Sequence, residues 1–155
     1  MTKTPADSMP VTDEELIQRY PGRAITHDTK AIYRGWLEHR LLIARCTECG
    51  RWNIPTHDVC SACWSRAVVP SEVSGDGTIF MYVLLHQGPP GIDYSTPYPV
   101  VTVELDEQPG LRITATVVGA SNDQIRIGRR VALDLIERDG APVPAFRIVR
   151  DAAST

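Results

Sequence analysis

Apolar and polar positions follow a helical period in the first part of the chain. Thr12 comes directly before a run of acidic residues, and its hydroxyl is suited to accept a hydrogen bond from the free backbone N–H groups of a first turn. Acidic side chains at this end are favoured by the helix dipole. The pattern predicts a short helix over residues 13–18, ended by Pro21-Gly22.

A second helix is predicted from about Asp28, with its apolar positions on one side. Ile32, Trp36 and Leu37 form the stripe, and polar residues separate them. Such a stripe must be covered by another surface, and we take these three residues as candidates for contact with a partner.

From Gly75 onward the apolar period changes to two, which indicates strands. Turn-forming Gly, Pro, Asn and Asp residues lie between the alternating sets. Five short strands joined by such turns suit a small closed barrel, most simply an OB-like one, and an SH3-like barrel is the alternative. The five sets are Ile79 to Leu85, Val101 to Leu105, Leu111 to Val117, Val131 to Leu135, and Phe146 with Ile148.

The first of these strands is apolar on both faces. Phe80, Tyr82 and Leu84 alternate with the set that begins at Ile79. We expect one face to line the barrel, and the other to be covered by the remaining elements or by a partner.

The segment between helices and barrel carries all four cysteines of the chain, in two C-x-x-C pairs. Thiolates three positions apart on a tight turn can point at one cation, and two such turns supply the four sulfurs of a tetrahedral zinc site. Gly50 fits this turn, since it accepts positive φ. Short strands are expected before the first pair, at Leu41 to Ala44, and after it, at Ile54 and at Val68-Val69. The predicted ligands are Cys46, Cys49, Cys60 and Cys63.

Three other interpretations of the cysteines stay open. Two disulfides require an oxidising compartment, and the first thirty residues hold no secretory signal. A rubredoxin-like iron site uses similar cysteine pairs and would make the chain an electron carrier. A thioredoxin-type redox pair needs only one motif within a βαβ pattern, which is absent around both pairs. His57 lies between the pairs and is treated as a loop residue.

Composition narrows the function further. The chain has 155 residues, is 43% hydrophobic, carries a net charge of −3 and has no apolar run long enough to cross a membrane, so we expect it to be soluble and cytoplasmic. Residues 71–110 hold six acidic side chains and no Lys or Arg. No Ser-His-acid arrangement, phosphate-binding glycine loop or spare cysteine is present, so catalysis by this chain alone is not expected.

Together these motifs resemble the DUF35 family, whose members join a rubredoxin-like zinc ribbon to an OB-fold. The resemblance covers about residues 12–150. It begins with the helical lead-in and the two cysteine pairs. It continues in the barrel with four motifs in the same order as in the family: Gly75-Asp-Gly77-Thr-Ile-Phe, Pro97-Tyr98-Pro99-Val100-Val101, Ile127-Gly128-Arg129-Arg130-Val131 and Pro144-Ala145-Phe146.

The resemblance implies an accessory role. Such proteins accompany thiolase-like proteins that act on acyl-CoA thioesters, as acyltransferases or as lipid-transfer-type aldolases that shorten steroid side chains. This chain would be the non-catalytic zinc subunit of a hetero-oligomer, with acyl-CoA a candidate ligand at the interface. The alternatives are single-stranded nucleic-acid binding, against which the negative charge speaks, and iron-based electron transfer.

The loop before the second barrel strand is a further candidate contact surface. Long loops in compact domains are often functional, and this one is stiffened by prolines and carries His86, Tyr94 and Tyr98. Tyrosines offer large contact area at small entropic cost.

The expected fold is therefore mainly β with N-terminal helices, a rubredoxin-like zinc ribbon and a five-stranded OB-fold barrel. The expected segments are a disordered tail at 1–12, helices at 13–40, the zinc ribbon at 41–70, the barrel at 71–150 and a tail at 151–155.

Overall fold

The computed structural model describes residues 11–149, and two short helices open this part of the chain. Helix α1 runs Asp13–Arg19 and α2 runs Lys30–Leu37. Thr12 caps α1 as expected: its hydroxyl accepts from the Glu15 backbone N–H at 3.2 Å, and the Glu15 carboxylate accepts from the Thr12 N–H at 2.9 Å. The two predicted tails lie largely outside the described residues.

A small antiparallel sheet follows the helices. Its strands are β1 (Leu42–Cys46), β2 (Trp52–Asn53) and β3 (Val68–Glu72), in the order β2-β1-β3. The strands expected around the cysteines are confirmed, but Ile54 lies just beyond β2 and is half-exposed. The strand expected at Ile54 therefore ends one residue before it.

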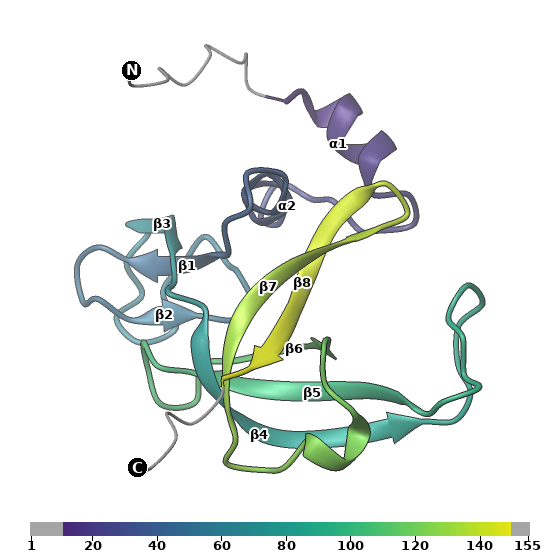
Figure 1. Cartoon of the computed structure of the whole chain (residues 1–155). Helices are drawn as coiled ribbons and strands as arrows, with labels where there is room; N and C mark the ends of the chain where they lie inside the picture. Colours follow the sequence, from purple (N-terminus) through teal and green to yellow (C-terminus); the bar gives the residue numbers. More distant parts are fainter. Residues whose placement is uncertain (1–10, 150–155) are drawn as a thin grey trace, which may run out of the picture.

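Five further strands close into the expected barrel, in the order β4-β5-β6-β8-β7 (Figure 1). A parallel pairing of β6 with β8 and an antiparallel pairing of β4 with β7 complete the closure. The strands are β4 (Asp76–Leu85), β5 (Tyr98–Leu105), β6 (Arg112–Val117), β7 (Arg130–Arg138) and β8 (Ala141–Ile148), with a 3₁₀ turn, η1 (Asn122–Gln124), before β7.

A β-bulge interrupts the alternation of β4. Its register against β5 shifts between Ile79 and Met81, so Ile79 is fully buried while Met81 and Val83 are nearly half exposed. Tyr82 then packs against the core instead. A strict period of two would place Met81 and Val83 on the same face as Ile79. Because of the bulge, the residues after it that face the core belong to the opposite set.

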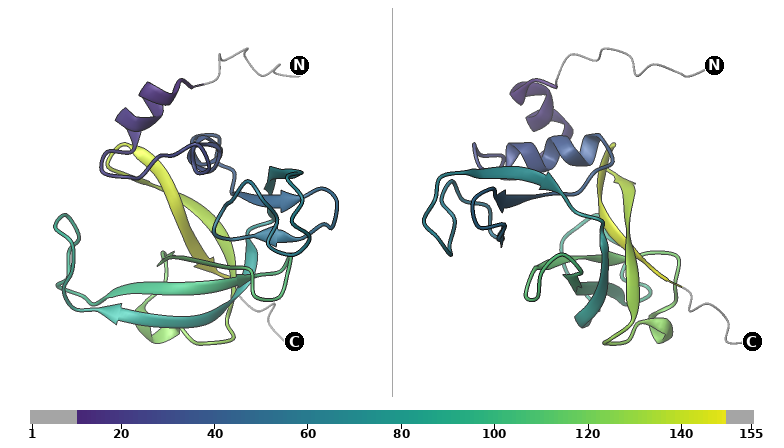
Figure 2. Two further views of the ribbon diagram at one scale, coloured as in Figure 1. Left: turned by 180° about the vertical axis from the view of Figure 1, so that it is seen from behind. Right: turned by 90° about the vertical axis from the view of Figure 1, so that its left-hand side faces the viewer.

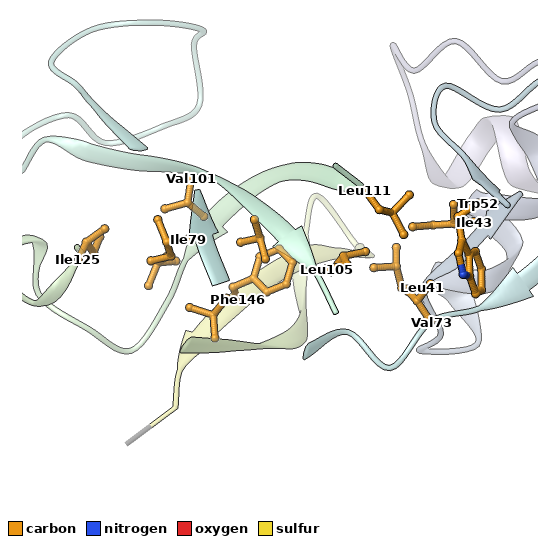
Figure 3. Close-up of a cluster of buried hydrophobic side chains, with 13 residues drawn as sticks. Leu41, Ile43, Trp52, Val73, Ile79, Val101, Leu105, Leu111, Ile125 and Phe146 are labelled. Atoms are coloured by element: carbon orange, nitrogen blue, oxygen red, sulfur yellow. The ribbon is translucent and has the colours of Figure 1, made fainter. Parts of the chain in front are cut away.

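One hydrophobic core extends from the small sheet into the barrel. Leu41, Ile43 and Trp52 on the ribbon side meet Leu105 and Leu111 on the barrel side (Figure 3). At the far end, the cluster continues to Phe146 and Ile125 inside the barrel. The ribbon and barrel are therefore packed against each other through shared apolar side chains.

A second cluster holds the helices against the end of the β7–β8 hairpin (Figure 2). Leu16 and Tyr20 of the α1 region are buried there with Ala141 and Val143 of β8. Trp36 packs against both clusters, and its ring makes edge contacts with Tyr20 and Tyr33. Within residues 11–149 there is no helix of the length and apolarity that a membrane crossing requires.

Candidate metal centre

The four cysteine sulfurs gather at one point at the tip of the small sheet. All ligand atoms lie within 4.8 Å of one another, with Sγ–Sγ distances of 3.6 Å for Cys46–Cys63 and 3.5 Å for Cys49–Cys60. Around a tetrahedral zinc with Zn–S bonds of about 2.3 Å, neighbouring sulfurs lie roughly 3.8 Å apart. The cysteines are free thiols, and their arrangement fits a single four-coordinate cation.

The two cysteine turns have the same backbone hydrogen-bond pattern. In the first turn the Cys46 N–H donates to the Arg51 carbonyl at 2.9 Å, and the Gly50 N–H donates to the Cys46 carbonyl at 2.9 Å. In the second turn the Cys60 N–H donates to Ser65 at 2.8 Å, and the Trp64 N–H donates to Cys60 at 3.0 Å. Both cysteine pairs are thus presented by equivalent turns.

Backbone N–H groups inside the turns favour thiolate at the first cysteine of each pair. The backbone N–H of Ala62, followed by that of Cys63, lowers the pKa of Cys60 to about 6. The backbone N–H of Cys49 likewise lowers the pKa of Cys46. At Cys63 the Ser65 N–H lowers the pKa, but interactions with neighbouring thiols and burial outweigh it and raise the pKa to about 12. Metal coordination requires the deprotonated sulfur.

Asn53, at the end of β2, is a buried polar residue that contacts the second cysteine turn. It is 4% exposed, and its Oδ1 accepts from the Ser61 backbone N–H at 3.1 Å and from the Ser61 hydroxyl at 2.9 Å. Its Nδ2 donates to the Arg51 carbonyl at 3.0 Å and toward Cys60 Sγ at 3.9 Å. One side-chain amide therefore links β2, the second turn and a candidate metal ligand.

Gln108, in the loop between β5 and β6, ties the ribbon to the barrel. The Trp52 backbone N–H donates to Gln108 Oε1 at 3.0 Å, and Gln108 Nε2 donates to the Trp52 carbonyl at 3.2 Å. The side-chain amide thus pairs with β2 as a neighbouring strand would.

The candidate residues of the 86–98 loop are partly brought together. The rings of Tyr94 and Tyr98 meet edge to face at 6.4 Å, and the Tyr98 hydroxyl accepts a hydrogen bond from Arg138. His86 is exposed at the start of the loop. The tyrosines thus pack on each other, and Tyr98 also contacts Arg138 of the β7–β8 hairpin, whereas His86 faces solvent.

The candidate residues of α2 lie beside two hollows. Ile32 and Trp36 line an apolar hollow of about 290 Å³ between α2 and the small sheet. Trp36 also lines a second hollow of about 300 Å³ with Tyr98 and Arg138. Leu37 packs in the second hydrophobic cluster instead.

Sequence reasoning missed three residues of this region. Asn53 and Gln108 have no motif, since their partners lie 8 and 56 residues away. Trp64 is 81% exposed directly after Cys63, and its position next to a cysteine pair was the one available signal.

A four-cysteine ribbon packed on a five-stranded OB barrel defines the class of this protein: a zinc-ribbon and OB-fold protein of the rubredoxin-like type. Residues 34–69 match the family model for the rubredoxin-like zinc ribbon domain of ChsH2, and residues 71–135 match the model for its C-terminal OB-fold domain. The chain belongs to the DUF35 family, as the motifs predicted.

Among solved structures, the fold is similar to the Ltp2-ChsH2(DUF35) aldolase, with a TM-score of 0.73 and 33% identity over 81% of this chain and 98% of that one. A DUF35 protein of unknown function from Sulfolobus solfataricus shares the fold at a TM-score of 0.57 and 12% identity, covering 86% of this chain and 92% of that one.

Curated relatives have a consistent description. A DUF35 domain-containing scaffold protein of Methanocaldococcus jannaschii is 29% identical over 107 residues, which are 66% of this chain and 74% of the relative. The corresponding scaffold protein of Pyrococcus furiosus is 28% identical over 96 residues, 62% of this chain and 68% of the relative.

Proposed function

We propose that this chain is a zinc-binding scaffold subunit that binds and stabilises a thiolase-like enzyme acting on acyl-CoA, with a steroid side-chain aldolase the specific candidate. The observation that carries the proposal is the combination of a four-sulfur site with a fold and a 33% identical sequence shared with a chain of the Ltp2-ChsH2(DUF35) aldolase. The metal would fix the ribbon, and the catalytic groups would come from the partner. Reduced cysteines of this kind suit the cytoplasm.

Zinc is the proposed metal, held by Cys46, Cys49, Cys60 and Cys63. A closed shell of four thiolates is typical of structural zinc, which adds folding energy and performs no redox step. Iron in the same shell is the alternative and is distinguished by its visible iron–thiolate absorption and reversible bleaching. Elemental analysis of protein purified without added metal should find one zinc per chain in a colourless sample.

The scaffold role is tested by co-expression with a thiolase-like protein of the same organism. We expect a stable hetero-oligomer on size exclusion with light scattering, aldolase or acyltransferase activity only in the complex, and no turnover by the isolated chain. A purified chain that processes an acyl-CoA thioester alone, or one that leaves the thiolase-like protein unbound at micromolar concentrations, would refute the proposal.

The hollows beside Trp36 are our candidate for an acyl contact at the interface. The hollow lined by Ile32 and Trp36 is apolar, and the neighbouring one adds Tyr98 and the guanidinium of Arg138. The 86–98 loop, with His86 and Tyr94, joins β4 to β5, and Tyr98 at its end lines the second hollow. Substituting Ile32 by Asp in the complex should raise KM for a long-chain acyl-CoA more than for acetyl-CoA.

Nucleic-acid binding receives less support. OB-folds that bind single strands stack bases on exposed aromatic rings within a basic groove. Here the Arg112 guanidinium lies 3.4 Å over the Phe80 ring, so one face of that ring is already covered, and residues 71–110 carry only acidic charge.

A further inference from the structure

Trp64 has the largest exposed fraction among the large apolar side chains of residues 11–149, at 81%. It directly follows Cys63, a candidate metal ligand, at the tip of the ribbon. Tryptophan side chains bury large apolar area when they fold into a core, so one left almost wholly in water contributes little to the stability of its own chain.

The backbone at Trp64 is also unusual for its residue type. Its φ is +61°, in the left-handed region that a bulky side chain rarely adopts. The equivalent residue of the first cysteine turn is Gly50, with φ +75° and the same N–H to cysteine carbonyl hydrogen bond. The turn therefore requires the conformation that glycine adopts freely, and the second turn places a tryptophan there.

A tryptophan that helps neither the core nor its own turn points to a role outside the chain. We propose that Trp64 is the aromatic anchor by which the ribbon binds the enzyme subunit, its ring seated in an apolar slot of that subunit. This inference rests on the proposed scaffold function. Strained backbone at an exposed residue is typical of functional sites, and tryptophan is enriched among the residues that dominate binding energy.

The surroundings of Trp64 favour a protein slot over other ligands. Its neighbours Ser61, Ala62 and Ser65 are small and uncharged, which suits a single anchor surrounded by a closely fitting rim. The nearest charged residues in sequence, Asp58 before the second turn and Arg66 after it, are of opposite sign. A nucleic-acid site would instead need clustered basic residues.

The metal centre determines where this anchor points. Trp64 lies between Cys63 and Ser65, whose carbonyl accepts from Cys60, so the turn that holds the ring is the turn that holds two candidate ligands. Partner affinity should therefore depend on bound metal, although Trp64 itself touches no metal.

The test is Trp64→Gly in the full chain, measured with the co-expressed thiolase-like protein. Glycine suits this φ, so the thermal midpoint and metal content of the isolated variant should equal those of the wild type or exceed them. Affinity for the enzyme subunit should nevertheless fall about 30-fold or more, the size expected of a dominant anchor. Ile17→Ala, which truncates a side chain 56% exposed on α1, is the matched control and should change affinity less than about threefold.

The outcomes separate this inference from the function it rests on. If the wild-type chain forms no complex, the scaffold function fails. If the wild type binds and Trp64→Gly binds within threefold of it, the anchor is wrong and the scaffold role stands. If wild-type chains alone self-associate and Trp64→Gly abolishes that, the slot belongs to a second copy and the proposed occupant is wrong.

Discussion

At Asn53 a single amide side chain holds the second cysteine turn and faces a candidate ligand. Its oxygen is satisfied by Ser61, and its nitrogen faces the Cys60 sulfur. Hydrogen bonds from a neighbouring residue to a metal ligand orient that ligand and tune the metal site. The burial of this polar group is explained by its full set of partners.

Replacing Asn53 by Asp should weaken metal binding. The aspartate keeps an oxygen for Ser61 but turns a second, negatively charged oxygen toward the Cys60 sulfur, which repels a thiolate. We expect zinc affinity to fall about 10- to 100-fold, measured by competition with a chromogenic chelator. Ser61→Ala, which removes the hydroxyl and keeps the backbone N–H bond, is the control. Equal zinc affinity in Asn53→Asp and the wild type would contradict this role.

Tyr20 makes stability depend on pH in the alkaline range. Its hydroxyl donates to the Pro142 carbonyl at 2.8 Å, and burial raises its pKa from 10 to about 12. Folding thus favours the neutral phenol, so its contribution is complete below pH 10 and is lost as the pH rises from 10 to 12. The difference in unfolding free energy between wild type and Tyr20→Phe should shrink over this window in urea titrations. A pH-independent difference would contradict this account.

At the scale of elements, β2 is a two-residue strand held by a side chain from the barrel. Gln108 exchanges two hydrogen bonds with the backbone of Trp52, on the edge of β2 away from β1. A strand this short needs such a partner, since unpaired buried backbone groups are costly.

Removing the Gln108 amide should loosen the ribbon edge. Gln108→Ala loses two hydrogen bonds, worth about 1–3 kcal/mol of unfolding free energy together. Hydrogen exchange should show faster exchange at the Trp52 amide, with little change at Val103 inside the barrel. Gln108→Glu keeps the acceptor and loses the donor, so the Trp52 amide of this variant should also exchange faster than that of the wild type. Unchanged protection of Trp52 in both variants would show that the bridge contributes nothing.

The elements themselves were largely predictable, because local patterns determine them. The capped α1, the two cysteine turns, and the alternating barrel strands follow from residues close in sequence. The bulge after Ile79 was not predictable, since the run Ile79 to Leu85 is apolar at every position and contains no residue that marks a register shift. The roles of Asn53 and Gln108 could not be predicted, because their contacts form only when distant segments meet.

At the scale of the whole molecule, the metal site and the barrel are linked through one core. Cys46 ends β1, and the same strand carries Ile43 into the hydrophobic cluster that continues through Leu105 to Phe146. Trp52 on β2 joins this cluster, between the cysteine turns and Gln108. Loss of the metal should therefore lower the stability of the barrel as well as that of the ribbon.

Removing the metal should lower the stability of the entire chain. Metal-binding energy is folding energy in a ribbon this small, so a chelator should shift unfolding to lower temperature in a single transition. The three tryptophans, at positions 36, 52 and 64, all lie in α2 and the ribbon and report there by fluorescence, whereas far-UV circular dichroism mainly follows the barrel strands.

The two signals should fall together in the chelated sample and recover together when zinc is added back. Cys63→Ser without chelator should reproduce the shift, because it removes one of the four sulfurs and leaves the hydrophobic cluster intact. If fluorescence instead changes at low temperature while the dichroism transition keeps its midpoint, the barrel folds without the ribbon, and the shared core does not couple the two.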